Sequence, residues 1–80
     1  MKLTVRDYDT YKDYEFDNIK SITPDFINCE LLITCSTDFV SESDFERVFE
    51  DWVLSVQTLK DKEIFAQIYF PSSCSIQIDE

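Results

Sequence analysis

Glycine and histidine are absent from the 80-residue chain, and its seven basic residues are outnumbered by seventeen acidic ones. Without glycine the chain cannot carry a glycine-rich phosphate loop, a dinucleotide-binding fingerprint or a nucleophile elbow. Without histidine it lacks the commonest general base and the commonest metal ligand. Because glycine is absent, turns that need a positive φ must use Asn or Asp, or be longer loops.

The three cysteines give no indication of catalysis or of a metal site. A cysteine nucleophile would have no histidine partner, all three cysteines lie on apolar faces of predicted strands, and no CxxC pair is present. We therefore expect neither an enzyme nor a cofactor. Cys29 and Cys35 are roughly 20 Å apart along one predicted strand, too far to pair. We expect reduced thiols, with a Cys29–Cys74 or Cys35–Cys74 bridge as the alternative.

The net charge of −10 restricts the class of partner. It disfavours direct binding to nucleic acid or to an anionic membrane, and it favours a basic protein. The chain is 44% hydrophobic, which suffices for a core in one domain, residues 1–80. No apolar run is long enough to span a membrane and no charged-then-apolar leader is present, so we expect a cytoplasmic protein.

One helix is predicted, over residues 41–61. Hydrophobic residues recur there at steps of three and four, and they would share one face of a helix. Ser41 is the favoured N-cap and Ser43 the alternative, because a hydroxyl at that position accepts a hydrogen bond from a free backbone N–H. The residues on the apolar face are Phe45, Val48, Phe49, Trp52, Val56 and Leu59.

Apolar and polar residues alternate through most of the remaining chain, as is typical of strands. A parity change at Asn18 indicates either a bulge or the end of a strand, and Thr23-Pro24-Asp25 indicates a turn. The order β-β-β-α-β-β predicts an α+β fold, in which one helix covers a mostly antiparallel sheet of four to five strands. The predicted strands cover residues 2–8, 13–22, 27–35 (central in the sheet), 64–70 and 74–78.

Two groups of acidic residues are candidate partner-binding sites. Glu42, Glu46 and Glu50 lie four residues apart and would form a ridge on the polar side of the predicted helix. Like charges at this spacing destabilise a helix by about 0.2–0.5 kcal/mol per pair. The ridge is interpreted either as a solvated face or as a carboxylate surface for a basic partner.

The second group lies in the segment DYDTYKDYEFD, residues 7–17, where five acids alternate with three tyrosines and a phenylalanine. Alternate residues of a strand are roughly 6.6 Å apart, close to two of the about 3.4 Å phosphate steps of DNA. These acids would then imitate a phosphate track. The alternative is an edge hairpin whose charges prevent aggregation. The predicted contact residues are Asp9, Asp13, Glu15 and Asp17.

A short, acidic, glycine-free α+β domain with clustered carboxylates resembles the small inhibitors encoded by bacteriophages, among them DNA-mimic and anti-CRISPR proteins. The resemblance concerns size and composition and matches no family motif, so it transfers no site residue. It implies a protein of the host-cell cytoplasm that occludes the nucleic-acid-binding site of a basic protein or complex. The alternatives are an immunity or antitoxin-like protein that neutralises a cognate toxin, and a phage structural or assembly module, for which a homo-oligomer is possible.

Overall fold

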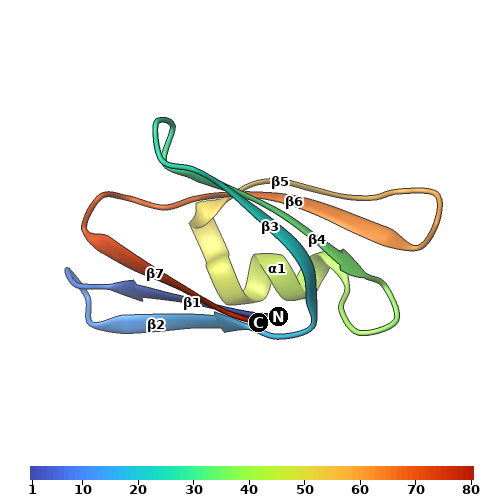
Figure 1. Cartoon of the computed structure of the whole chain (residues 1–80), viewed down its shortest axis with the longest axis horizontal. Helices are drawn as coiled ribbons and strands as arrows, with labels where there is room; N and C mark the ends of the chain where they lie inside the picture. The colour runs from blue at the N-terminus through green and yellow to red at the C-terminus, as the bar shows by residue number, and fades with distance from the viewer.

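Seven antiparallel strands form two sheets, with a single short helix between β4 and β5 (Figure 1). The computed structural model describes all of residues 1–80. The three-stranded sheet has the order β2-β1-β7, and it comprises β1 (Lys2–Asp7), β2 (Lys12–Phe16) and β7 (Cys74–Asp79). The four-stranded sheet has the order β3-β4-β6-β5, and it comprises β3 (Ile19–Asp25), β4 (Glu30–Ser36), β5 (Val53–Thr58) and β6 (Glu63–Tyr69).

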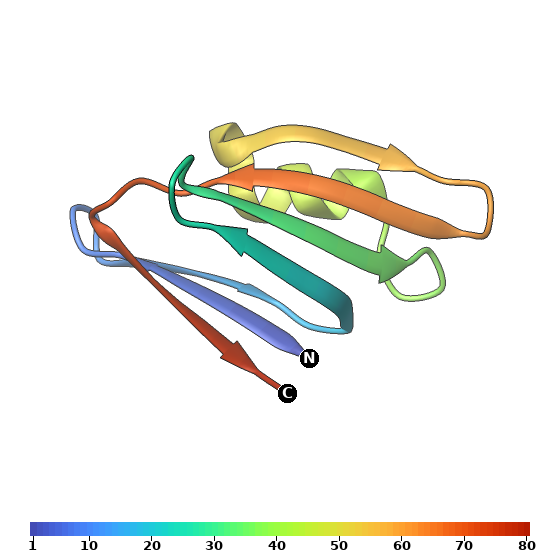
Figure 2. The ribbon, with the colours of Figure 1, turned by 45° about the horizontal axis from the view of Figure 1, so that its top comes forward.

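The α+β class and the antiparallel pairing are confirmed, whereas the number of strands is larger than predicted. The segment expected as one strand over 13–22 is divided at Asn18, which has a φ of 60°. Both interpretations of the parity change are right, because a strand ends before Asn18 and the register of β3 against β4 also shifts between Ile19 and Ser21. At Asn18 the chain leaves the three-stranded sheet and enters the four-stranded one (Figure 2). β4 is central, as predicted, because it pairs with both β3 and β6.

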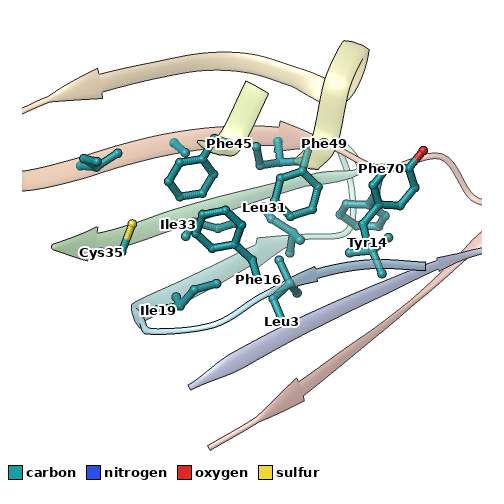
Figure 3. Packing of buried hydrophobic residues seen from close by; sticks show 14 residues of the cluster. Leu3, Tyr14, Phe16, Ile19, Leu31, Ile33, Cys35, Phe45, Phe49 and Phe70 are labelled. Atoms are coloured by element: carbon teal, nitrogen blue, oxygen red, sulfur yellow. The ribbon is translucent and has the colours of Figure 1, made fainter. Parts of the chain in front are cut away.

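A single cluster of buried hydrophobic residues joins the two sheets to the helix (Figure 3). α1 (Glu42–Phe49) contributes Phe45 and Phe49, both fully buried. The ring of Phe45 stacks on Phe16 of β2 at 4.2 Å between centroids, and Phe49 stacks on Tyr14 at 6.0 Å. The remaining buried members are Leu3, Val5, Ile19, Leu31, Ile33, Cys35, Ile64, Ala66, Ile68 and Phe70.

The helix is much shorter than predicted, which corrects the expectation of a helix over 41–61. It begins after its N-cap Ser41, as expected, but ends at Phe49, and a 3-10 turn (Glu50–Trp52) leads into β5. The pairing of β5 with β6 shifts between Val53 and Ser55, so that Val53 and Val56 both lie opposite buried residues of β6. Trp52 and Val56, both predicted on the helix face, therefore lie in the 3-10 turn and on the bulged strand β5 instead. Leu59, expected on the buried face, is exposed.

The turn predicted at Thr23-Pro24-Asp25 is also wrong. These residues form the end of β3, where Pro24 lies opposite Leu31. β3 is an edge strand, and edge strands tolerate a residue without an N–H. The turn follows at residues 26–29, where the Asp25 carboxylate accepts hydrogen bonds from the backbone N–H groups of Ile27 and Asn28 at 3.1 and 3.2 Å. Ile27, expected in the central strand, is exposed in this turn.

Five residues adopt a positive φ in the absence of glycine, and only Asn18 is of the expected type. Three of the others each end a four-residue connection between strands: Tyr11, Cys29 and Lys62. These connections agree with the prediction that turns without glycine would be longer loops. Glu50, with φ 54° and ψ −125°, stands at the end of α1. A non-glycine residue at a positive φ outside the left-handed helical well costs roughly 1–3 kcal/mol.

The strain at Glu50 predicts that glycine is more stable than alanine at position 50, the reverse of the order expected inside α1. Glu50→Gly should be more stable than Glu50→Ala by about 1 kcal/mol, because glycine adopts this conformation without a steric cost. Both variants lose the same side chain, so their difference isolates the backbone. At Glu46, inside α1, the glycine variant should instead be less stable by about 1 kcal/mol. Urea unfolding measures all four; an alanine preference at both positions would contradict the strained C-terminus of α1.

Candidate protein-binding surface around α1 and β2

α1 packs between β2 of the three-stranded sheet and β5 of the four-stranded sheet (Figures 1 and 2). Its buried face carries the two phenylalanines, so its other sides face outward beside the two neighbouring strands. Of the predicted helix acids, Glu42 lies towards β5 and Glu50 towards the start of β2. The predicted hairpin acids lie on β2 and beside its ends. No helix of the structure combines the length and the hydrophobicity that crossing a membrane requires.

A groove of about 240 Å³ separates β2 from α1. Glu15 and Asp17 line its β2 side, and Asp44 and Arg47 line its helix side. The backbone N–H of Ser41 donates to Asp44 at 2.8 Å, and the Arg47 guanidinium donates to the same carboxylate at 3.3 Å. Both hydrogen bonds lower the pKa of Asp44, and the bond from Ser41 has the larger effect. The Asp44 carboxylate is therefore charged at neutral pH.

The predicted ridge of three helix acids is only partly formed. Glu42 and Glu46 lie on α1, but Glu50 follows its end at a positive φ. Glu42 accepts a hydrogen bond from the Thr58 hydroxyl of β5 at 2.9 Å, and Glu50 pairs with Lys12 at 3.0 Å. Glu46 has neither an ion pair nor a side-chain hydrogen bond. The three carboxylates therefore differ in how readily a partner can reach them.

The hairpin acids have cationic neighbours on the adjacent strand that sequence reasoning missed. The Arg6 guanidinium donates to both carboxylate oxygens of Asp13, at 2.8 and 3.1 Å, and lowers its pKa. Lys2 lies 3.6 Å from Glu15. These pairs follow from the register of β1 and β2, in which Arg6 lies opposite Asp13. The sequence indicates these ion pairs only if the register of the β1–β2 hairpin is already known.

The structure places six of the seven predicted residues around α1 and β2, and Asp9 apart from them in the turn at residues 8–11. The Lys12–Glu50 ion pair connects the start of β2 to the end of the helix. The groove connects Glu15 and Asp17 to α1. We refer to Asp13, Glu15, Asp17, Glu42, Glu46 and Glu50 together as the carboxylate surface.

Cations are too few to neutralise the acids of the chain. Five ion pairs use five of the seven basic residues, which leaves twelve of the seventeen acids without an ion-pair partner. On the carboxylate surface, Asp17, Glu42 and Glu46 belong to this unpaired group. Exposed ion pairs such as Lys12–Glu50 contribute only about 0–1 kcal/mol, so a partner's cation can replace Lys12 at little cost.

All three cysteines are free, so the alternative disulfides predicted for Cys29, Cys35 and Cys74 are not formed. Burial, with a smaller contribution from Glu63, raises the pKa of the Cys35 thiol to about 11. Burial also raises the pKa of the Cys74 thiol. Since the thiolate is the nucleophilic form, the raised pKa values lower the reactivity of these two thiols at neutral pH.

Comparison with known proteins assigns no family: a scan against family models, a search of curated proteins and a search of solved structures each returned no match. A function must therefore be inferred from the charge, exposure and geometry of the residues described above.

The Arg6–Asp13 pair predicts a measurable titration shift. The pKa of Asp13 should lie below the ordinary aspartate value of about 3.9 and should return towards it in Arg6→Gln. Because the pKa is lowered by folding, the stability this pair contributes is present above the ordinary value and lost as the pH falls through the lowered one. Asp25 is the internal control, since Asn28 rather than an arginine lowers its pKa.

Carbon-detected NMR titration of the side-chain carboxyl groups measures both residues in one experiment. An Asp13 that titrates at the ordinary value in the wild-type protein, or a shift of Asp25 equal to that of Asp13 in Arg6→Gln, would contradict the assigned pairing.

Proposed function

We propose that this protein is a small acidic inhibitor that binds a basic, nucleic-acid-handling protein or complex and occludes its nucleic-acid-binding site. The observation that carries the proposal is the excess of acids without ion-pair partners, three of which belong to the carboxylate surface. One of the three, Asp17, lines the groove, where Arg47 is the one cation. Complementary charge on a partner accelerates association and selects against wrong partners. Occlusion requires no catalytic step, and none is proposed.

The spacing of the carboxylates supports imitation of a phosphate backbone. Glu42 and Glu46 are separated by one helical turn, about 6 Å along the axis. Asp13 and Glu15 alternate on one face of β2, about 6.6 Å apart. Both values approach two phosphate steps of DNA, each about 3.4 Å. Glu50 has left the helix, but the two remaining pairs keep the spacing on which the hypothesis depends.

The partner would supply the cations that the chain lacks. Lysine and arginine side chains arranged to bind phosphates would meet Asp17 and Glu46 directly, and would compete with Lys2 and Lys12 for Glu15 and Glu50. The same net negative charge opposes direct binding of the protein to nucleic acid. The proposed complex is therefore one protein bound to another, weakened by salt and exclusive of nucleic acid.

Charge reversal tests the proposal with a matched control. Asp17→Lys/Glu46→Lys reverses two acids that have no ion pair, so folding should be unaffected. The control Asp61→Lys/Glu80→Lys makes the same change in net charge away from the surface. Tagged proteins are used to capture partners from a bacterial lysate at about 0.1 M and about 1 M salt, and affinity for the captured protein is then measured after purification.

We expect a nucleic-acid-binding partner that is lost at high salt, with affinity reduced tenfold or more by Asp17→Lys/Glu46→Lys, which is at least about 1.4 kcal/mol. The control pair should change the affinity less than about threefold, since screening weakens distant charges. Equal losses in the two double variants would show that net charge alone is responsible. Retention of a toxin or of only further copies of the chain would contradict the proposal in favour of the immunity or the assembly alternative.

A further inference from the structure

β5 is an outer strand of the four-stranded sheet, and β6 is its only strand neighbour (Figure 2). Its sequence VLSVQT contains no charged residue and no proline. The other three edge strands, β2, β3 and β7, each contain at least one charged residue. Charges and prolines on an edge strand discourage the addition of a further strand. The one protecting feature of β5 is the bulge between Val53 and Ser55, near its start.

The backbone groups along the outer edge of β5 have no partner. Residues 54–58 take part in none of the backbone hydrogen bonds that lie outside the helices and strands. α1 lies behind β6 and leaves the outer edge of β5 uncovered (Figure 2). Unpaired N–H and C=O groups in a row are a template for pairing with another chain.

A row of three carboxylates follows β5 along α1. Glu42, at the start of α1, accepts a hydrogen bond at 2.9 Å from the hydroxyl of Thr58, the last residue of β5. Glu46 and Glu50 lie beside the other end of the strand, in a hollow of about 650 Å³. The other residues that line this hollow are Asp51, Val53, Leu54, Ser55 and Val56. α1 and β5 therefore run in opposite directions, and we name Glu42, Glu46 and Glu50 the acidic row.

Most of the charge of the acidic row is not compensated within the chain. No lysine or arginine lines the hollow. Of the seven basic residues, Lys12 alone forms an ion pair with the row, at Glu50. The others pair with different acids or form no ion pair, and the latter are the two lysines of the connection after β5, Lys60 and Lys62. Cations from outside the chain can therefore pair with Glu42 and Glu46.

A strand added to β5 would place its side chains at the spacing of this row. Alternate residues of a strand point to the same face at intervals of about 6.6 Å. Glu42 and Glu46 are one helical turn apart, about 6 Å along the axis. Two residues at alternate positions, on the face of the sheet that α1 covers, would each meet one of these carboxylates. Lysine or arginine at both positions is the complementary choice.

We propose that an extended segment of the partner, with lysine or arginine at alternate positions, adds to the outer edge of β5 and pairs its basic side chains with Glu42 and Glu46. Main-chain hydrogen bonds provide affinity in such strand additions, and alternate side chains provide selectivity. The inference rests on the proposed function for the basic character of the partner, and it specifies the conformation of the segment that binds. A second copy of the chain is a poorer occupant, because pairing of β5 with β5 brings two acidic rows towards each other.

The test uses two synthetic peptides of equal length and charge, in both of which lysine alternates with threonine. In the second peptide every backbone nitrogen is methylated, so it has no N–H to donate to a strand edge. Affinities are measured by NMR titration of the isotope-labelled protein at about 0.1 M salt. Hydrogen exchange of the β5 amides is followed in each complex, because exchange slows where a backbone N–H becomes paired.

Two double variants with the same loss of charge separate the acidic row from the rest of the surface. The test variant is Glu42→Gln/Glu46→Gln, in which glutamine at position 42 still accepts the Thr58 hydroxyl. The control is Asp79→Asn/Glu80→Gln, which changes two exposed acids at the end of β7, in the other sheet.

We expect the unmodified peptide to bind about tenfold more tightly than the methylated one, with slowed exchange of β5 amides. Its affinity should fall about tenfold in Glu42→Gln/Glu46→Gln and less than about threefold in the control. Equal affinity of the two peptides, unchanged exchange of β5, or equal effects of the two double variants would each overturn the inference. A dimer of the free protein in which the β5 amides are already protected would also overturn it, in favour of a second copy as the occupant.

Failure of the proposed function gives a different set of results. If the unmodified peptide adds to β5 but the protein captured from the lysate does not bind nucleic acid, the proposed function fails and strand addition stands. If the two peptides bind equally but the captured partner is still weakened by Asp17→Lys/Glu46→Lys and lost at high salt, the inference alone fails.

Discussion

The contact of Phe45 and Phe49 with Phe16 and Tyr14 is the interaction on which the arrangement of the molecule depends (Figure 3). It holds a helix of eight residues, too short to be stable alone, between the two sheets. Because both helix phenylalanines are fully buried, α1 cannot rotate about its axis. Its acids are consequently held at fixed positions beside β2 and β5, and the carboxylate surface is a consequence of core packing.

The distribution of charge is consistent with a surface kept for an external partner. The ion pairs Arg6–Asp13 and Lys20–Glu63 connect neighbouring regions of the sheets, and exposed pairs of this kind contribute little to stability. The acids left without cations repel one another in the free protein. A basic partner would relieve that repulsion on binding, so the electrostatic cost in the free state becomes a driving force for association.

The sequence predicts the strands well and their assembly poorly. Period-two alternation located β1, β4, β6 and β7, because a half-buried strand must alternate. The end of α1 was missed because Trp52 and Val56 are spaced as on one face of a helix, although they lie in the 3-10 turn and on β5. The second sheet was missed because a single residue, Asn18, redirects the chain. The site acids were named from their spacing, but the cations Lys2 and Lys12 that pair with two of them depend on tertiary contacts that spacing does not reveal.

Displacement of nucleic acid from the captured partner shows whether the protein occludes the nucleic-acid-binding site of that partner. A fluorescently labelled nucleic acid is first bound to the purified partner, and its anisotropy is followed as the acidic protein is added. We expect the anisotropy to fall to that of free nucleic acid as the acidic protein reaches stoichiometric excess, because the protein and the nucleic acid would occupy one site. A ternary complex, in which the anisotropy rises while the nucleic acid stays bound, would contradict the proposed occlusion.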